Sequence, residues 1–119
     1  MAYAKAFATD SIPKTTIQFE VGSHDFGEIK QESTHKFSFK FTNTGNEPLV
    51  IVNAKGSCGC TIPSFSEEKI LPGESGEINI EYHSEEQEGG QNKTVTITAN
   101  TNPETTILGV FAEVIPTKK

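Results

Sequence analysis

The two cysteines of the chain lie two residues apart in the stretch KGSCGCT, residues 55–61. Gly59 separates them, and because glycine has no Cβ the backbone there can bend until the sulfurs of Cys58 and Cys60 meet. A disulfide needs Cα atoms within about 7 Å of each other. Residues at this spacing meet that limit only when bent, so the small ring is expected to be strained, easily reduced and of little value as a staple.

The same pair could instead act as a metal ligand or a redox centre. Two thiolates can hold a soft ion, Cu(I) above all, which would make the chain a copper-binding or copper-delivery protein. Zinc is disfavoured because it takes four ligands, and the chain has three histidines and no further cysteine. A thiol–disulfide function is disfavoured because Lys55 is the only nearby cation and no helix N-terminus is expected. A strained disulfide, a reduced pair packed in a turn, a metal chelate and a redox pair all stay open.

His24 and Asp25 form a second candidate group. As functional residues they could ligate a metal or transfer a proton. As structural residues, one of them would bond backbone groups where the first strand crosses between sheets, and Phe26 would fill the core. The structural interpretation is favoured, and His35 and His83 are expected to be exposed at strand ends.

Other polar residues are expected to be structural. Asn43 should close the loop before Pro48 through an Asx turn, and Pro72-Gly73 should form a turn before the next strand. No serine lies on a strand–turn–helix elbow, and no glycine-rich phosphate loop is present. The sequence therefore predicts no enzyme.

The elements that must position these residues are strands. Residues 16–21, 36–42, 77–82 and 94–99 alternate apolar and polar side chains, which is typical of half-buried strands. Residues 49–52 form a short β-branched run expected to be an inner strand. Residues 106–115 are apolar on both faces, so both are expected to be covered. Leu108, Val110, Ala112 and Val114 share one face, and Ile107, Phe111 and Ile115 share the other.

Clusters of Gly, Asn and Pro separate these segments, the pair Gly89-Gly90 among them, and no helical stripe is present. Seven to eight short strands with frequent turns predict an all-β fold, an antiparallel β-sandwich. The sandwich is Ig-like in architecture only, because the chain has no Trp and its cysteines are too close in sequence for an inter-sheet bridge.

Length and charge limit the classes of function. The 119 residues suit a single domain, expected over residues 16–119. A net charge of −6 with no basic cluster argues against nucleic-acid binding. No apolar run approaches the roughly 20 residues of a membrane-spanning helix. Residues 1–15 read as a tail or the remnant of an export signal, since Ala2-Tyr3-Ala4 and Ala6-Phe7-Ala8 have the small-x-small pattern of a cleavage site.

Four stretches in order resemble the motifs of the bacterial DUF1573 family, a domain of unknown function. They are HDFGEI at residues 24–29, FKFTNTGNEPLVI at 39–51, SCGCTIP at 57–63 and ILPGESGEI at 70–78. The resemblance covers nearly the whole chain and includes Gly27 of the first motif. One departure is Glu32-Ser33, near which many members have a glycine, and it affects a turn.

The resemblance implies an Ig-like sandwich akin to major-sperm-protein and ciliary ASH modules. It also implies an exported protein of the periplasm or cell surface, often lipid-anchored in its full-length form, and no established activity. The leading hypothesis is a non-enzymatic protein-binding or assembly module. Its exposed edge strands could accept a strand of an unidentified protein partner by β-augmentation, and its polar loops could carry specificity.

Overall fold

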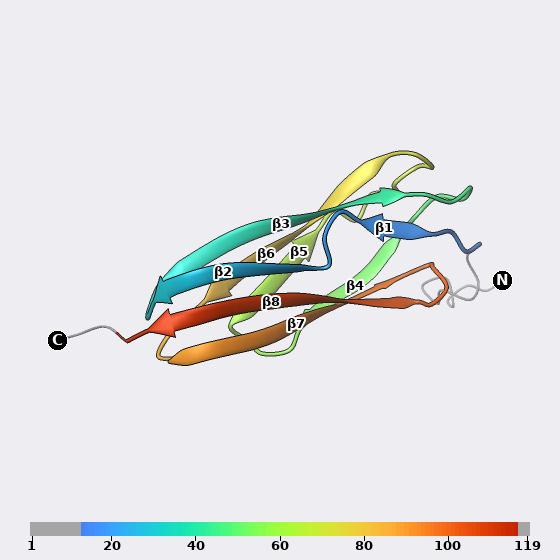
Figure 1. The fold of residues 1–119 in the computed structure, drawn as a ribbon. Coiled ribbons are helices and arrows are strands. Elements are labelled where there is room, and N and C mark those ends of the chain that lie inside the picture. The colour runs from blue at the N-terminus through green and yellow to red at the C-terminus, as the bar shows by residue number, and fades with distance from the viewer. Residues whose placement is uncertain (1–12, 117–119) are drawn as a thin grey trace.

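A computed structural model describes residues 13–116, which form eight strands (Figure 1). Most of the segment predicted as a tail or signal remnant, residues 1–12, lies outside the described residues. The strands are β1 (Ile17–Phe19), β2 (Ser23–Lys30), β3 (Thr34–Asn43), β4 (Ile51–Gly56), β5 (Thr61–Phe65), β6 (Ser75–His83), β7 (Gly89–Ala99) and β8 (Thr105–Ile115). Among these residues no helix could cross a membrane.

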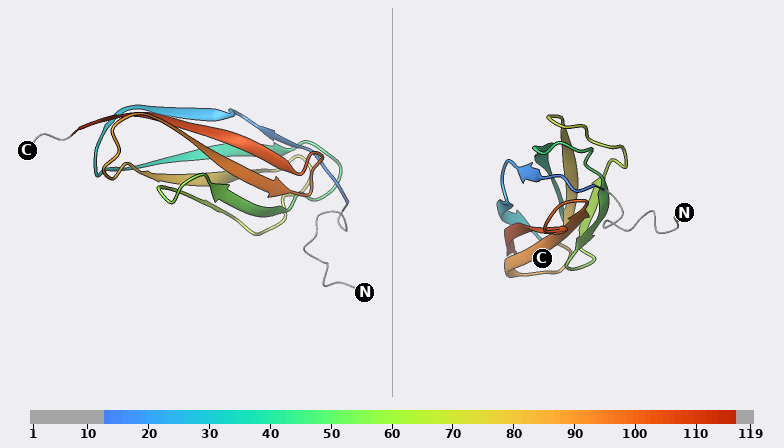
Figure 2. Two further views of the ribbon diagram at one scale, coloured as in Figure 1. Left: turned by 90° about the horizontal axis from the view of Figure 1, so that it is seen from below. Right: turned by 90° about the vertical axis from the view of Figure 1, so that its right-hand side faces the viewer.

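The strands form two four-stranded sheets that pack as a sandwich (Figures 1 and 2). One sheet has the order β1-β3-β6-β5 and the other the order β2-β8-β7-β4. The all-β, Ig-like sandwich predicted from the alternating segments is confirmed. All strand pairs are antiparallel except β2 and β8, which run parallel. That pair joins residues about 85 positions apart, so local sequence patterns could not reveal its direction.

The core lies between the facing sheets, where the period-two patterns place it. Phe39 and Phe41 of β3 are buried and pair with Ile78 and Gly76 of β6. Opposite them, β7 and β8 bury apolar side chains of the second sheet. The residues that share this core are Leu49, Ile51, Ile80, Val95, Ile97, Ala99, Leu108 and Val110. Burial of each large aliphatic or aromatic side chain stabilises the fold by roughly 1.5–3 kcal/mol.

Three local details differ from the sequence expectations. The run at residues 49–52 is not an inner strand, because Leu49 makes an isolated bridge to Ile70 and β4 lies at a sheet edge. Strand β5 was not evident because Pro63 reads as a strand breaker. Gly89-Gly90 begins β7, with Gly89 at a φ of 81°, and the turn before this strand is at residues 85–86, where Glu85 has a φ of 51°.

Candidate functional site

The cysteine turn connects β4 to β5 and so passes from one sheet to the other. Cys58 and Cys60 are joined as a disulfide with their Cα atoms 5.3 Å apart. Both are half-buried, and Cys60 packs against a small cluster that includes Ile29 and Tyr82. The hydroxyl oxygen of Thr61 lies 4.0 Å from the Cys58 sulfur and 3.8 Å from the Cys60 sulfur.

The backbone at the two ends of this turn, Gly56 and Thr61, comes close together. A Cβ at Gly56 would lie 2.3 Å from the carbonyl oxygen of Thr61, so only glycine fits there without a shift of the backbone. Within residues 13–116, no group of three or more His, Cys, Asp or Glu side chains could hold a metal ion. Within these residues the two sulfurs therefore have no group of further metal-ligating side chains around them. The oxidation state in which the pair functions stays a prediction.

His24 and Asp25 do not form a pair. Successive side chains of a strand point to opposite faces, and the His24 ring stacks on Phe37 with centroids 3.7 Å apart. Asp25 is exposed, and its Oδ1 accepts a hydrogen bond of 2.8 Å from the Gly27 amide. Phe26 contacts both core clusters. These contacts match the structural interpretation of the motif. The structure adds that Gly27 takes a φ of 75° at a bulge in β2.

The other two histidines make local contacts at strand ends. The Nε2 atom of His35 lies 2.9 Å from the Ser33 hydroxyl. His83 lies between Thr34 and Glu81, with Nδ1 3.1 Å from the hydroxyl of Thr34 and Nε2 3.2 Å from the Glu81 carboxylate. Both are half-buried rather than fully exposed.

Two buried asparagines organise the end of the sandwich where the chain enters. Asn43 Oδ1 accepts hydrogen bonds from the Thr15 hydroxyl and the Gly45 amide, and its Nδ2 donates to the carbonyls of Glu47 and Ile70. The bond from the Gly45 amide to the Asn43 side chain is that of an Asx turn. The amide of Gly73, after Pro72, donates to the Asn43 carbonyl.

Asn100 has a similar role. Its Nδ2 donates to the carbonyls of Pro13 and Pro48, and its Oδ1 accepts from the Val50 amide. Pro13 and the buried Thr15 therefore contact the sandwich although the sequence placed them in the N-terminal segment.

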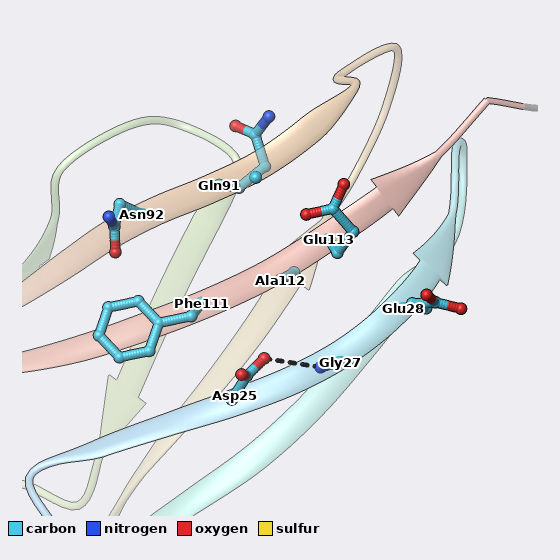
Figure 3. A pocket seen from close by; sticks show the side chains of 9 residues that line it. Asp25, Gly27, Glu28, Gln91, Asn92, Phe111, Ala112 and Glu113 are labelled. Atoms are coloured by element: carbon cyan, nitrogen blue, oxygen red, sulfur yellow. Dashed lines mark hydrogen bonds between the residues drawn. The ribbon is translucent and has the colours of Figure 1, made fainter.

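A groove on the outer face of β2, β8 and β7 was not evident from the sequence. It has a volume of about 580 Å³, and its lining includes Asp25, Glu28, Asn92, Phe111 and Glu113. In Figure 3 the Phe111 ring lies between Asn92 and Asp25, with Glu113 further along β8. The apolar residues on both faces of residues 106–115 were the available signal.

The expected cover over this face is absent from the described part of the chain. Ile107 is 64% exposed, Ile115 is exposed, and Phe111 is half-buried. By contrast, the other sheet presents opposite charges at paired positions, with Lys36 opposite Glu81 and Lys40 opposite Glu77. At paired positions the two outer faces of the sandwich therefore differ in charge.

Each sheet edge carries a feature that hinders the addition of a strand. Strand β1 has three residues, and β2 and β4 are interrupted by register shifts. The His83 amide of β6 donates to the Cys60 carbonyl, so the backbone N–H and C=O groups of residues 60, 62 and 64 point toward β6. The backbone nitrogen of Pro63 therefore points toward the open edge of the sheet. Proline has no N–H to offer a partner strand. These edges do not favour the predicted β-augmentation.

Tyr82 has a pKa that is shifted by its burial. Its side chain is fully buried, and burial raises the pKa of the phenol above the usual 10.0. The hydroxyl donates a hydrogen bond to Oε1 of Gln87. Tyr82 lies in the cluster against which Cys60 packs.

The two four-stranded sheets and their strand order define an Ig-like β-sandwich. The chain belongs to the family described as protein of unknown function (DUF1573), whose model matches residues 17–114. No curated protein matches the chain in sequence.

Solved structures share the fold at low identity. A protein of unknown function from Porphyromonas gingivalis W83 has a TM-score of 0.73 and 16% identity, covering 85% of this chain and 47% of that one. PapD-like domain 7 of human CEP192 has a TM-score of 0.71 and 10% identity over 89% of both chains. The CupB2 chaperone of Pseudomonas aeruginosa has a TM-score of 0.63 and 11% identity, covering 82% of this chain and 55% of that one. This chain spans about half of the P. gingivalis protein.

Proposed function

We propose that the chain is a non-enzymatic protein-binding or assembly module of an exported protein, acting in the periplasm or at the cell surface. The observation that carries this proposal is the outer face of β2, β8 and β7, which residues 13–116 leave uncovered. Ile107 is 64% exposed there, and Phe111 and Ile115 follow it along β8. An apolar stripe of this kind on a folded domain favours contact with another protein.

Further observations support parts of the proposal. All three histidines are engaged in ring stacking or in contacts with neighbouring side chains, which suits a structural role better than acid–base catalysis. A disulfide persists in oxidising compartments, which fits export. The CupB2 and YadV structures are chaperones of the same fold, although a shared fold does not by itself fix a function.

A capture experiment with two matched variants tests this function. The wild-type chain, cross-linked in the native envelope, should retain a specific partner. Ile107→Glu should abolish that capture because it places a charge on the proposed face. Ile62→Glu, at a 49% exposed isoleucine of the opposite sheet, should not. The proposal fails if no specific partner is recovered, or if both variants retain the partner as well as the wild type does.

Copper binding or delivery is the second candidate, with a thiol–disulfide function behind it. The turn holds both sulfurs within bonding distance of each other, so on reduction both could reach one soft ion. The test is a free-thiol count without reductant, followed by titration of the reduced chain with Cu(I). Tight stoichiometric binding that is lost in Cys58→Ser and in Cys60→Ser would support copper. Absence of binding against a micromolar competitor would exclude it.

A further inference from the structure

The groove beside Phe111 exists because three neighbouring positions lack side chains. Gly27 and Gly90 border it from β2 and β7. A Cβ at Gly109 would lie 2.9 Å from Cζ of Phe111, so the aromatic ring extends along the sheet over Gly109. A Cβ at Gly27 would meet no atom within 4 Å, so the space next to Gly27 is open.

The groove gathers three carboxylates, those of Asp25, Glu28 and Glu113. Glu28 and Glu113 lie at paired positions of β2 and β8, and Asp25 lies opposite Phe111. Glu113 is directed toward β7, since its Oε1 lies 3.6 Å from where a Cβ of Gly90 would be. The ion pairs within residues 13–116 include none of these three carboxylates. Lys30, the neighbouring lysine on β2, is paired with Ile115 two residues further along.

This arrangement carries a cost that the opposite face avoids. Like charges at adjacent positions repel, whereas the Lys36–Glu81 and Lys40–Glu77 positions of the other sheet attract. At paired positions, opposite charges thus meet on one outer face, whereas Glu28 and Glu113 place like charges together on the other. A departure of this kind from local consistency is expected where a surface serves binding.

A guanidinium or ammonium group complements both parts of the groove. Carboxylates accept its hydrogen bonds, and the face of an aromatic ring attracts a cation within about 6 Å. Arginine fits best because its planar group can stack on a ring while it donates to a carboxylate. Ile107 and Phe111 are four residues apart on one strand, which is roughly 13 Å.

We propose that the outer face of β2, β8 and β7 binds a segment of a partner protein that carries an arginine or lysine. The basic group lies between Phe111 and the carboxylates of Glu28 and Glu113, and an apolar side chain of the same segment contacts Ile107. This inference rests on the proposed protein-binding function and specifies the chemistry of the partner.

The test uses two peptides and paired carboxylate variants. The probes are acetyl-Leu-Ser-Thr-Ser-Arg-amide and the same peptide with glutamine in place of arginine, each titrated into isotope-labelled chain and followed by amide NMR. The arginine peptide should give saturable shifts confined to residues 25–28, 90–92 and 107–113. The double variant Glu28→Gln/Glu113→Gln should weaken its affinity at least about fivefold, as should a rise in salt. Glu77→Gln/Glu81→Gln on the opposite face should change the affinity less than about twofold.

Several outcomes would overturn the inference. They are shifts spread over both faces, equal affinity for the glutamine peptide, and an unchanged affinity in the Glu28/Glu113 variant. Loss of fold would not confuse the result, since glutamine keeps the shape and removes repulsion, and thermal unfolding of each variant checks this. If a partner is captured through Ile107 but the peptide affinity does not depend on Glu28 and Glu113, the inference is refuted and the proposed function still stands.

Discussion

Asn43 and Asn100 replace backbone pairing where several loops meet. Each is fully buried and uses both ends of its side-chain amide. Because buried polar groups are costly when unpaired, these two side chains determine how the entering chain and the loops around Pro48 close over the core.

Asn43→Ala should destabilise the fold by about 2–4 kcal/mol, because the buried Thr15 hydroxyl and the Gly45 amide lose their acceptor. The free energy of unfolding in urea measures the effect. Asn79→Ala is the matched control, since exposed Asn79 accepts only the Ser38 hydroxyl and its loss should cost about 0.5 kcal/mol or less. Equal costs for the two variants would contradict this role.

Glu32 adopts a φ of 55° in the turn after β2, the conformation that glycine tolerates best. Its amide also donates to the Glu85 carbonyl. Glu32→Gly should leave the free energy of unfolding unchanged or raise it by up to about 1 kcal/mol. Glycine removes the strain of the positive φ, and this gain offsets the larger chain entropy of the unfolded state. Glu32→Val should destabilise by about 1 kcal/mol or more. Thermal unfolding compares the two, and a reversed order would refute the assignment of strain to this turn.

Tyr82 links stability to alkaline pH. Its pKa is raised in the folded state, so its contribution is fully present below the unfolded value of 10.0 and is lost as the pH rises through the folded value. Unfolding free energy should therefore fall from about pH 10 upward, and it should fall less in Tyr82→Phe. Chemical unfolding at pH 8 and pH 11 measures the difference, and parallel profiles would contradict it.

At the scale of elements, the sheet edges are protected against association, whereas the outer face of β2, β8 and β7 is not. Each of the four edge strands is short, interrupted by a register shift or, in β5, contains a proline, and such features protect against association between copies. The face of β2, β8 and β7 has no such protection. Recognition of a partner is therefore more consistent with this face than with an added strand.

Pro63→Thr tests the protective role of the β5 edge. Threonine restores an outward N–H and favours strands, so the variant should self-associate more than the wild type. Light scattering at increasing concentration measures this, with Ser64→Thr as control because residue 64 bonds inward to β6. Equal association of the Pro63→Thr chain and the wild type would show that Pro63 does not protect this edge.

At the scale of the whole molecule, two clusters divide the interior. The larger joins both sheets through Phe39, Ile78, Val95 and Leu108, and the smaller holds Tyr82, Ile29, Ala112 and Val114. The cysteine turn contacts only the smaller cluster through Cys60. We therefore expect reduction of the disulfide to disturb the packing of the smaller cluster before that of the loops bound by Asn43 and Asn100.

The sequence alone determined the fold class and most strands, because a period of two is a local property that follows from strand geometry. It also indicated the roles of Asn43 and of the His24–Gly27 motif. It missed β5 because Pro63 in the strand obscured the pattern, and it misplaced residues 49–52 because apolar runs do not reveal sheet position.

Only the tertiary structure decided which surfaces are left open. The pattern of residues 106–115 showed two apolar faces, but which face lacks a neighbour depends on pairing with distant strands. The parallel pairing of β2 with β8 places Glu28 beside Glu113 and Asp25 beside Phe111. Contacts between residues so far apart are set by packing of the whole chain, so the groove could not be derived from local patterns.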